Sequence, residues 1–374
     1  MRSRLRFWKY PILLALLLVM TAAFTFIYGL SDKANAPHDY VEAPQPIVTH
    51  EPEPPEIDDV SGLTDEDEPE EDEDDGDEPP DEDKNEPEDE FYYSPQDDGY
   101  IIVSMDASDI HRGYLIFVNY EHAFEIPDEL DLVNIVDEKK EPFRVLGQHY
   151  LLQRSIIWAL DELMGGYIST TGNNAVAVIS GFRNYESQQR ILNEQIRLRG
   201  EREGRRWASE PGHSEHHTGL AVDFGVYAGG TRSTFTGTDV TAWFRRNAHK
   251  YGFILRFPAN KTHVTRVAHE PWHFRYVGLP HSVIMFENNW IFDEYIAMLR
   301  EYDINEPFEA EVDGQLYQIY FTAETDVPVP LGSMFDISGN NIDGFIVTAY
   351  IPSEHDALLI DAIEDGWIEV DEEE

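Results

Sequence analysis

The pentapeptide at residues 269–273, His-Glu-Pro-Trp-His, limits the folds open to this chain. A His-Glu-x-x-His run on a helix would place both histidines on one face, with the glutamate as a base beside a bound metal ion. Pro271 opposes such a helix, because its ring removes a backbone donor and disfavours the α region at Glu270. We therefore expect that only one of His269 and His273 binds a metal, and that the other ligands come from elsewhere.

A second group of metal-binding residue types lies upstream, between Ser214 and Asp223. A catalytic zinc ion takes three protein ligands through nitrogen or oxygen and leaves one position open. His216, Asp223 and His273 supply such a set, and Glu270 would stand beside the metal as a general base without being a ligand. Each of these residues alone has an ordinary surface or hydrogen-bonding alternative, and only together do they predict a metal centre. Since the chain has no cysteine, thiolate ligands and disulfide bonds are excluded.

Four segments follow one another in an order typical of one enzyme family: SGFR at 180–183, PGHSEHHTGLAVD at 211–223, YGFILRFP at 251–258 and EPWHFRY at 270–276. Together they resemble the VanY-type D-alanyl-D-alanine carboxypeptidases, over about residues 105–300. The resemblance implies zinc on His216, Asp223 and His273, with Glu270 as the base. It further implies that Arg183 polarises the scissile carbonyl and stabilises its oxyanion, and that three residues lie near the substrate: Gln188, Ser214 and Trp272.

The activity implied by the resemblance is zinc-dependent removal of the terminal D-Ala from peptidoglycan stem peptides that end in D-Ala-D-Ala. The same metal site would also serve an L,D-carboxypeptidase or a D,D-dipeptidase, because the motifs do not specify the substrate pockets. A catalytically inert wall-binding protein is a further alternative, and the simplest alternative for Arg183 is an ion pair with a neighbouring carboxylate. His217 and Arg266 depart from the family, which usually has Gln and Gly there.

The first 36 residues have the pattern of a membrane signal-anchor. Arg2, Arg4, Arg6 and Lys9 precede an uncharged apolar stretch at residues 10–30, which as a helix would be long enough to cross a hydrocarbon core of about 30 Å. We expect a cytoplasmic basic tip and a catalytic domain outside the membrane. Cleavage after the Ala-Asn-Ala triplet at 34–36, which would release a secreted protein, is the alternative.

Residues 37–90 have the composition of a disordered, acidic and proline-rich spacer. Between residues 51 and 90 the chain has 24 Asp or Glu residues and a single lysine. Such a segment repels itself and cannot bury enough apolar surface to fold. The whole chain has a formal net charge of −46. We therefore expect no nucleic-acid partner, because binding to a phosphate backbone requires clustered Lys and Arg.

The rest of the chain predicts an α+β fold, in which a small antiparallel sheet with flanking helices surrounds a zinc cleft. We expect the peptidase domain at residues 91–307 and a small β-rich C-terminal appendage at 308–374. Strands are expected at 101–103, 114–118, 175–179, 219–226, 253–257 and 273–277, and helices at 143–164, 185–199, 240–250 and 291–302.

Overall fold

The structure is a computed structural model that describes residues 99–127 and 129–352. The predicted anchor at 1–36 and the predicted spacer at 37–90 lie outside these ranges, as do residues 353–374 of the predicted appendage. Within the ranges described, every helix is too short or too polar to span a bilayer.

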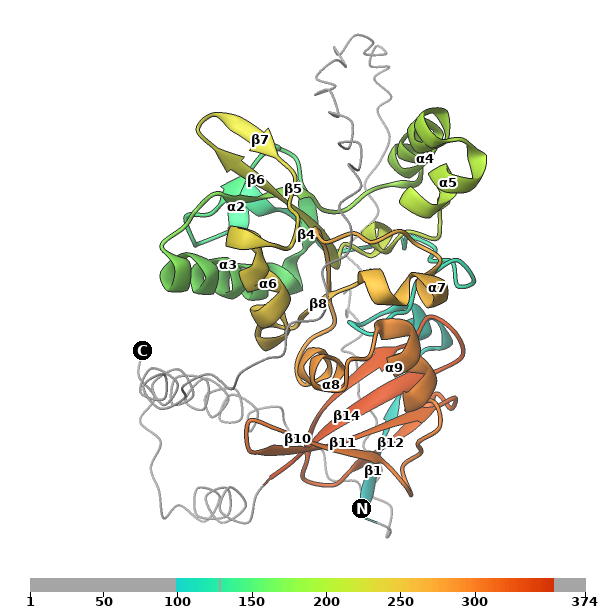
Figure 1. Cartoon of the computed structure of the whole chain (residues 1–374). Helices are drawn as coiled ribbons and strands as arrows, with labels where there is room; N and C mark the ends of the chain where they lie inside the picture. Colours follow the sequence, from blue (N-terminus) through green and yellow to red (C-terminus); the bar gives the residue numbers. More distant parts are fainter. Residues whose placement is uncertain (1–98, 128, 353–374) are drawn as a thin grey trace, which may run out of the picture. The chain divides into compact units, whose positions relative to one another are not determined.

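A mixed sheet forms the centre of the peptidase part, with strand order β3-β5-β6-β9-β8 and with β7 paired to the end of β6 (Figure 1). Adjacent strands of this sheet are antiparallel, except for the parallel pair β3 and β5. The strands are β3 (Arg144–Val145), β5 (Val176–Ser180), β6 (Ala221–Ala228), β7 (Thr231–Ser233), β8 (Phe253–Leu255) and β9 (His273–Tyr276). A separate pair joins β2 (Leu132–Asn134) to β4 (Leu151–Gln153).

The two faces of this sheet have different environments because successive side chains of a strand point to opposite sides. On one face Val222, Phe224 and Phe274 pack in an apolar core with α3 (Ile157–Thr171) and α6 (Ala242–Asn247). Asp223 and His273 alternate with these residues and therefore point to the other face. The expected α+β architecture is confirmed, and with it the expectation that Asp223 points away from the core.

Two helices follow β5 and end before the segment that carries His216. Helix α4 (Tyr185–Arg199) is bounded as predicted: the Asn184 side chain accepts from the Ser187 amide at its start, and Gly200 follows its end with φ 81°. Helix α5 (Glu201–Trp207), which the sequence analysis missed, begins directly after Gly200. The remaining α-helices of residues 99–352 are α2 (Ile135–Glu138), α7 (Thr262–Thr265), α8 (His281–Glu287) and α9 (Phe292–Leu299).

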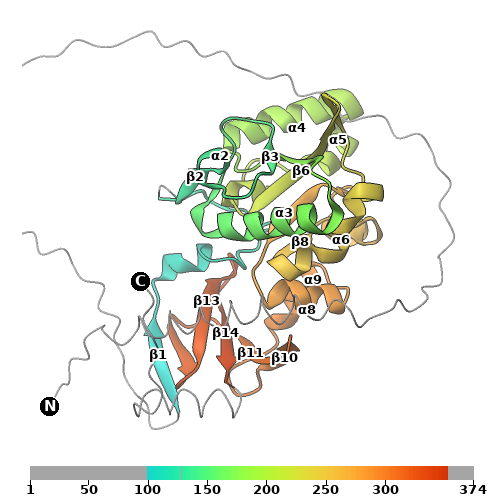
Figure 2. The same ribbon diagram turned by 90° about the vertical axis from the view of Figure 1, so that its left-hand side faces the viewer.

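The C-terminal strands form a sheet in the order β10-β11-β14-β13, covered on both faces (Figure 2). Helices α8 and α9 share an apolar core with one face, and the pair β1–β12 shares a second core with the other. The strands are β1 (Tyr100–Ser104), β10 (Phe308–Val312), β11 (Gln315–Thr322), β12 (Asp326–Pro330), β13 (Met334–Gly339) and β14 (Phe345–Ile351). Since β1 pairs with β12, the β-rich part also includes residues 100–104, which the sequence analysis assigned to the peptidase domain.

The strand expected at residues 114–118 is wrong in a way that has a physical explanation. The segment is irregular, yet Leu115 and Phe117 enter the core beneath α8 and α9, while Ile116 and Val118 enter the core of the central sheet. The alternation is therefore real, but no strand of the described ranges pairs with this segment. Arg275 donates to the carbonyl oxygens of residues 114 and 116, and the Phe117 amide donates to the Asn340 carbonyl oxygen. The pattern of burial was right and the backbone pairing was not.

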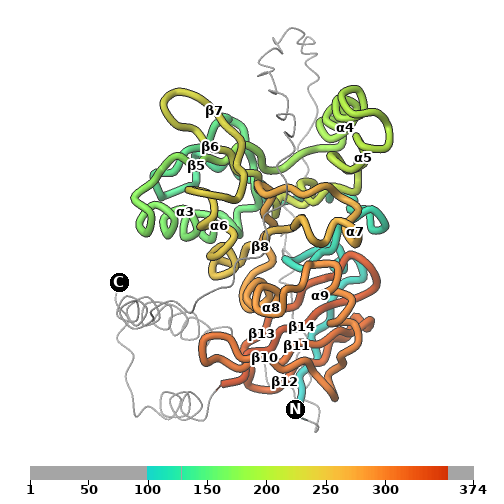
Figure 3. The backbone as a smooth tube through the Cα atoms, viewed as in Figure 1, coloured from blue at the N-terminus to red at the C-terminus, as the bar shows by residue number. Residues whose placement is uncertain are grey.

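The helix expected at 143–164 begins later than predicted. Residues 144–145 and 151–153 are the strands β3 and β4, and α3 starts only at Ile157. Residues 151–153 are extended because β4 pairs with β2, a strand from an earlier part of the chain, and they therefore cannot belong to the helix. Figure 3 shows α3 as a coil of the backbone beside β5.

Candidate functional site

Asp223 and His273 form a cross-strand pair at the centre of the site. They are direct partners in the antiparallel register of β6 and β9, which brings their side chains together on the face away from the core. His273 Nδ1 lies 3.1 Å from Asp223 Oδ1. Both residues are buried. The prediction that Pro271 prevents a helix here is confirmed, because residues 269–272 precede β9 without helical structure.

His216 reaches the same point from the short 3₁₀ helix η4 (Glu215–Thr218). Its Nδ1 lies 2.6 Å from the carbonyl oxygen of Gly181, so Nδ1–H donates there and Nε2 retains its lone pair. That Nε2 is buried, lies 3.2 Å from Asp223 Oδ2, and has no well-aligned hydrogen-bond partner among the described residues. Gly181 itself lies against the Leu151 carbonyl oxygen, from which a Cβ would stand only 2.3 Å away, so a side chain does not fit at this position.

These three residues fit a metal ion. One ligand atom from each of His216, Asp223 and His273 lies within 4.8 Å of the others, and all three residues are buried. Burial lowers the pKa of His216 to about 4, which keeps its ring neutral as a metal ligand requires. Burial alone would raise the pKa of Asp223, but His216, His273 and Arg183 hold it well below the usual range. Two nitrogen donors and a carboxylate are a donor set that zinc accepts.

Glu270 lies next to this group. Its Oε2 is 3.8 Å from His273 Nδ1, and 12% of its side chain is exposed. Burial raises the pKa of Glu270 to about 7, against the opposing effect of His273. A carboxyl group that titrates near neutrality can take and return a proton, which is what the predicted general base needs.

Arg183 borders the site from the turn after β5. Its Nη2 donates to Asp223 Oδ2 at 2.9 Å and its Nη1 donates to Gln188 Oε1 at 2.9 Å. The simplest alternative, an ion pair with a carboxylate, is thus present here, and 18% of the Arg183 side chain remains exposed. Gln188 is buried and also donates to the Ser209 carbonyl oxygen, so its position is that of a support for Arg183.

The other two residues expected near the substrate differ in exposure. Ser214 is buried directly before η4. Trp272 is half-buried and stacks on Trp207 of α5, with ring centroids 6.3 Å apart. The roles predicted for Ser214 and Trp272 stay predictions.

Histidines outside the ligand set have other partners. His217 Nε2 accepts from the Gly212 amide at 3.0 Å, and its Nδ1 lies 2.6 Å from the Arg183 carbonyl oxygen. Both ring nitrogens are therefore hydrogen-bonded to backbone groups. His269 Nδ1 lies 2.8 Å from the Phe257 carbonyl oxygen. Arg266, where the family usually has glycine, adopts a positive φ of 60°, the conformation that favours glycine.

A buried charged group behind the candidate metal ligands was not predicted from the sequence. Glu215 precedes His216 in the chain, but its carboxylate contacts Arg256, Arg275 and His273. The available signal was the placement of charged residues inside otherwise apolar segments, FILRF at 253–257 and HFRY at 273–276.

Comparison with known proteins places this geometry among peptidases. Residues 149–279 match the family model described as VanY, D-alanyl-D-alanine carboxypeptidase. A D-alanyl-D-alanine carboxypeptidase of Enterococcus faecium is 32% identical over 252 residues, which are 66% of this chain and 78% of that protein. A bifunctional D-Ala-D-Ala dipeptidase and D-Ala-D-Ala carboxypeptidase, VanXYC of Enterococcus gallinarum, is 34% identical over 32% of this chain and 65% of its own.

A solved structure extends the similarity to the tertiary fold. The vancomycin resistance D,D-dipeptidase VanXYg, in complex with a D-Ala-D-Ala phosphinate analogue, aligns with 67% of this chain and 98% of its own. The TM-score is 0.60 and the sequence identity 31%. The part of this chain that aligns is larger than the segment 149–279, so the likeness is not limited to the residues around the metal site.

Proposed function

This chain belongs to the VanY family of D-alanyl-D-alanine carboxypeptidases, and we propose that it uses zinc to remove the terminal D-Ala from peptidoglycan stem peptides. As a member of this family it is a hydrolytic peptidase. One observation carries the proposal: the buried ligand atoms of His216, Asp223 and His273 lie within 4.8 Å of one another, with Arg183 and Glu270 in contact with that group.

Zinc is the metal that we propose for this site. Its usual ligands are histidine nitrogen, carboxylate oxygen and thiolate, and this chain, which has no cysteine, offers the first two. When bound, zinc supplies Lewis-acid chemistry, which makes water more acidic and polarises a carbonyl group.

Glu270 is proposed to move the proton. With a pKa raised to about 7 by burial, its carboxylate can accept a proton from the attacking water at neutral pH and pass that proton to the amine of the leaving D-alanine. The same carboxyl group thus acts first as base and then as acid, and it needs no contact with the metal for either step.

Arg183 is proposed to stabilise the charge that develops on the carbonyl oxygen of the scissile bond. A positive group fixed in advance stabilises the negative transition state more than the neutral substrate. The contacts with Gln188 and Asp223 hold the guanidinium in place, and 18% of the side chain is exposed. Gln188 would therefore act on the substrate through Arg183.

A second candidate is D,D-dipeptidase activity. It is favoured by the similarity to VanXYg, which aligns with this chain over 98% of its own length. A carboxypeptidase must accommodate the rest of the stem peptide, whereas a dipeptidase acts on the free dipeptide. An L,D-carboxypeptidase would instead cleave the tetrapeptide that remains after the first D-alanine is lost.

One experiment separates these activities. The purified protein is incubated in turn with a pentapeptide ending in D-Ala-D-Ala, with the free D-Ala-D-Ala dipeptide and with the tetrapeptide, and the products are identified by mass. We expect free D-alanine from the pentapeptide, loss of this activity with a chelator, and recovery with added zinc. No product from any substrate would mean an inert binding protein.

Penicillin provides a test of the mechanism. Serine carboxypeptidases depend on a Ser-x-x-Lys nucleophile that β-lactams acylate, and no serine of this chain is followed three places later by lysine. The release of D-alanine should therefore continue in penicillin. Inactivation with a covalent adduct on a serine, together with indifference to the chelator, would overturn the metallopeptidase mechanism.

We further propose that the peptidase works on the outer side of a bacterial membrane, held there by residues 1–36. The support is the sequence alone: a basic start, an uncharged apolar stretch at residues 10–30, and a strongly acidic segment between that stretch and the peptidase domain. A location outside the membrane would give the active site access to peptidoglycan.

A further inference from the structure

Glu215 is a buried carboxylate that the mechanism proposed above does not use. It is 3% exposed, and a carboxylate so deeply buried is tolerated only when it is paired and hydrogen-bonded. Its Oε1 accepts from Arg256 Nε at 2.7 Å and lies 3.4 Å from Arg275 Nη1. Both arginines are fully buried as well, so the three side chains depend on one another.

The other oxygen of Glu215 contacts a proposed metal ligand. Oε2 lies 3.3 Å from His273 Nε2, while His273 Nδ1 faces Asp223. A carboxylate that accepts from one ring nitrogen of a histidine leaves the other nitrogen free for a metal, and it also holds the ring orientation. His216 has the same arrangement with the opposite nitrogens, because its Nδ1 donates to Gly181 and its Nε2 faces the site.

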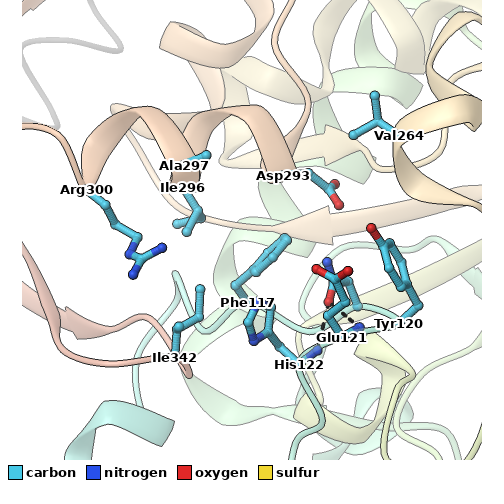
Figure 4. A pocket seen from close by; sticks show the side chains of 11 residues that line it. Phe117, Tyr120, Glu121, His122, Val264, Asp293, Ile296, Ala297, Arg300 and Ile342 are labelled. Carbon is cyan, nitrogen blue, oxygen red and sulfur yellow. Dashed lines mark hydrogen bonds between the residues drawn. The ribbon is translucent and has the colours of Figure 1, made fainter.

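The network continues from Glu215 towards α9. Arg256 Nη1 donates to Asp293 Oδ2 at 2.6 Å, and Asp293 stands in the first turn of α9. The other side of Asp293 borders a cavity of about 200 Å³, lined also by Tyr120 and Arg300 (Figure 4). A continuous chain of polar contacts thus runs from a helix that packs on the C-terminal sheet to His273.

We propose that Glu215 is a positioning residue for zinc: held by Arg256 and Arg275, it orients His273, and Asp293 of α9 stabilises this arrangement through Arg256. The proposal rests on the proposed zinc site at His216, Asp223 and His273. It gives the C-terminal β-rich part a role in the metal centre, because α9 shares its core with that sheet.

The test is the zinc affinity of Glu215→Gln, measured by competition with a chelator on the folded protein. The isosteric amide has one acceptor and one donor group, but the side chain faces donors on both sides, so an N–H must point either at the arginines or at His273. We expect zinc to bind about 10- to 100-fold more weakly than to the wild type. The visible spectrum of the cobalt-substituted protein, which reports ligand geometry, should change as well.

Glu294→Gln is the matched control. Glu294 also lies in the first turn of α9 and pairs with Lys261 at 2.8 Å, but the described structure gives it no contact with Arg256 or with the metal ligands. The control should lose some stability and keep the zinc affinity and the cobalt spectrum of the wild type. A change of zinc affinity in Glu294→Gln as large as in Glu215→Gln would mean a general loss of stability and would overturn the proposal.

Asp293→Asn is the second variant, in case Glu215→Gln does not fold. It removes the charge one residue further along the network and should weaken zinc binding in the same direction, by less. Wild-type zinc affinity and cobalt spectrum in a folded Glu215→Gln, or in Asp293→Asn if only that variant folds, would overturn the inference and leave the proposed function intact. Failure of the wild type to bind zinc would instead overturn the proposed function.

Discussion

His281 should make this protein less stable as the pH falls below neutrality. The residue begins α8 and is 3% exposed. Its Nδ1 lies 2.8 Å from the Tyr295 hydroxyl and its Nε2 lies 3.0 Å from the Thr348 hydroxyl of β14. Burial lowers the pKa of His281 to about 3. The folded protein therefore keeps this ring neutral over a range of pH in which the unfolded chain protonates it.

The magnitude follows from the difference between the two pKa values. Histidine in an unfolded chain has a pKa of about 6.5, so between about pH 6.5 and pH 3 the unfolded state binds a proton that the folded state does not. Above pH 6.5 the contribution of His281 is constant, and below it the free energy of unfolding falls by about 1.4 kcal/mol per pH unit. At pH 5 the loss amounts to about 2 kcal/mol, or roughly 4–8 °C in Tm for a folded part of this size.

The assay is urea unfolding of the wild type and of His281→Gln at pH 7, 6 and 5, with a chelator present so that metal binding does not contribute. Glutamine keeps groups that can bond to Tyr295 and Thr348 but does not titrate. The difference in stability between the two proteins should therefore shrink by about 2 kcal/mol from pH 7 to pH 5. His263→Gln, a change at an exposed histidine of α7, serves as control and should follow the wild type. Parallel pH profiles for the wild type and His281→Gln would refute the argument.

Further predictions concern the metal, the catalytic groups and the membrane. His269→Ala should retain stoichiometric zinc in metal analysis, because its ring bonds to the Phe257 carbonyl, whereas zinc should be lost on changing to Ala any of His216, Asp223 and His273. Glu270→Ala should keep zinc yet lose about 10²–10⁴-fold in turnover, and a near-normal rate would disprove its role as base. Arg183→Ala should lose about 10²–10³-fold in kcat, as expected for a removed oxyanion donor. The full-length protein should fractionate with membranes, and residues 91–374 alone should be soluble and active; a mature protein that starts near Pro37 in the medium would favour cleavage instead.

Local patterns were enough to predict several features of the site. Pro271 indicated that His269 and His273 do not share one face of a helix, and the structure has no helix at residues 269–272. Alternation along β6 placed Asp223 on the face away from Val222 and Phe224, as the structure shows. These features depend on residues adjacent in the chain, whose φ, ψ and side-chain directions follow from proline chemistry and from the two-residue period of a strand.

Other features depend on pairing between distant segments. The sequence shows strand-like alternation at residues 114–118 and at 101–103, but not their partners. Only the second segment pairs with a strand, β12, whereas the backbone of the first forms isolated hydrogen bonds, mainly with side chains such as that of Arg275. The observed boundary of the β-rich part differs from the predicted one for the same reason, since β1 and β12 pair although they lie far apart in the chain.

The chemistry of the candidate metal site could be read from the chain alone: which residue types are present, in which order, and which of them a helix cannot bring together. How that site is supported depends on contacts between distant segments. Glu215 adjoins His216 in the chain but contacts His273, Arg256 and Arg275, and Arg256 in turn reaches Asp293 of α9. The physical reason is that long charged side chains can be buried only where opposite charges from other segments meet them, and no periodicity along the chain records where those segments will lie.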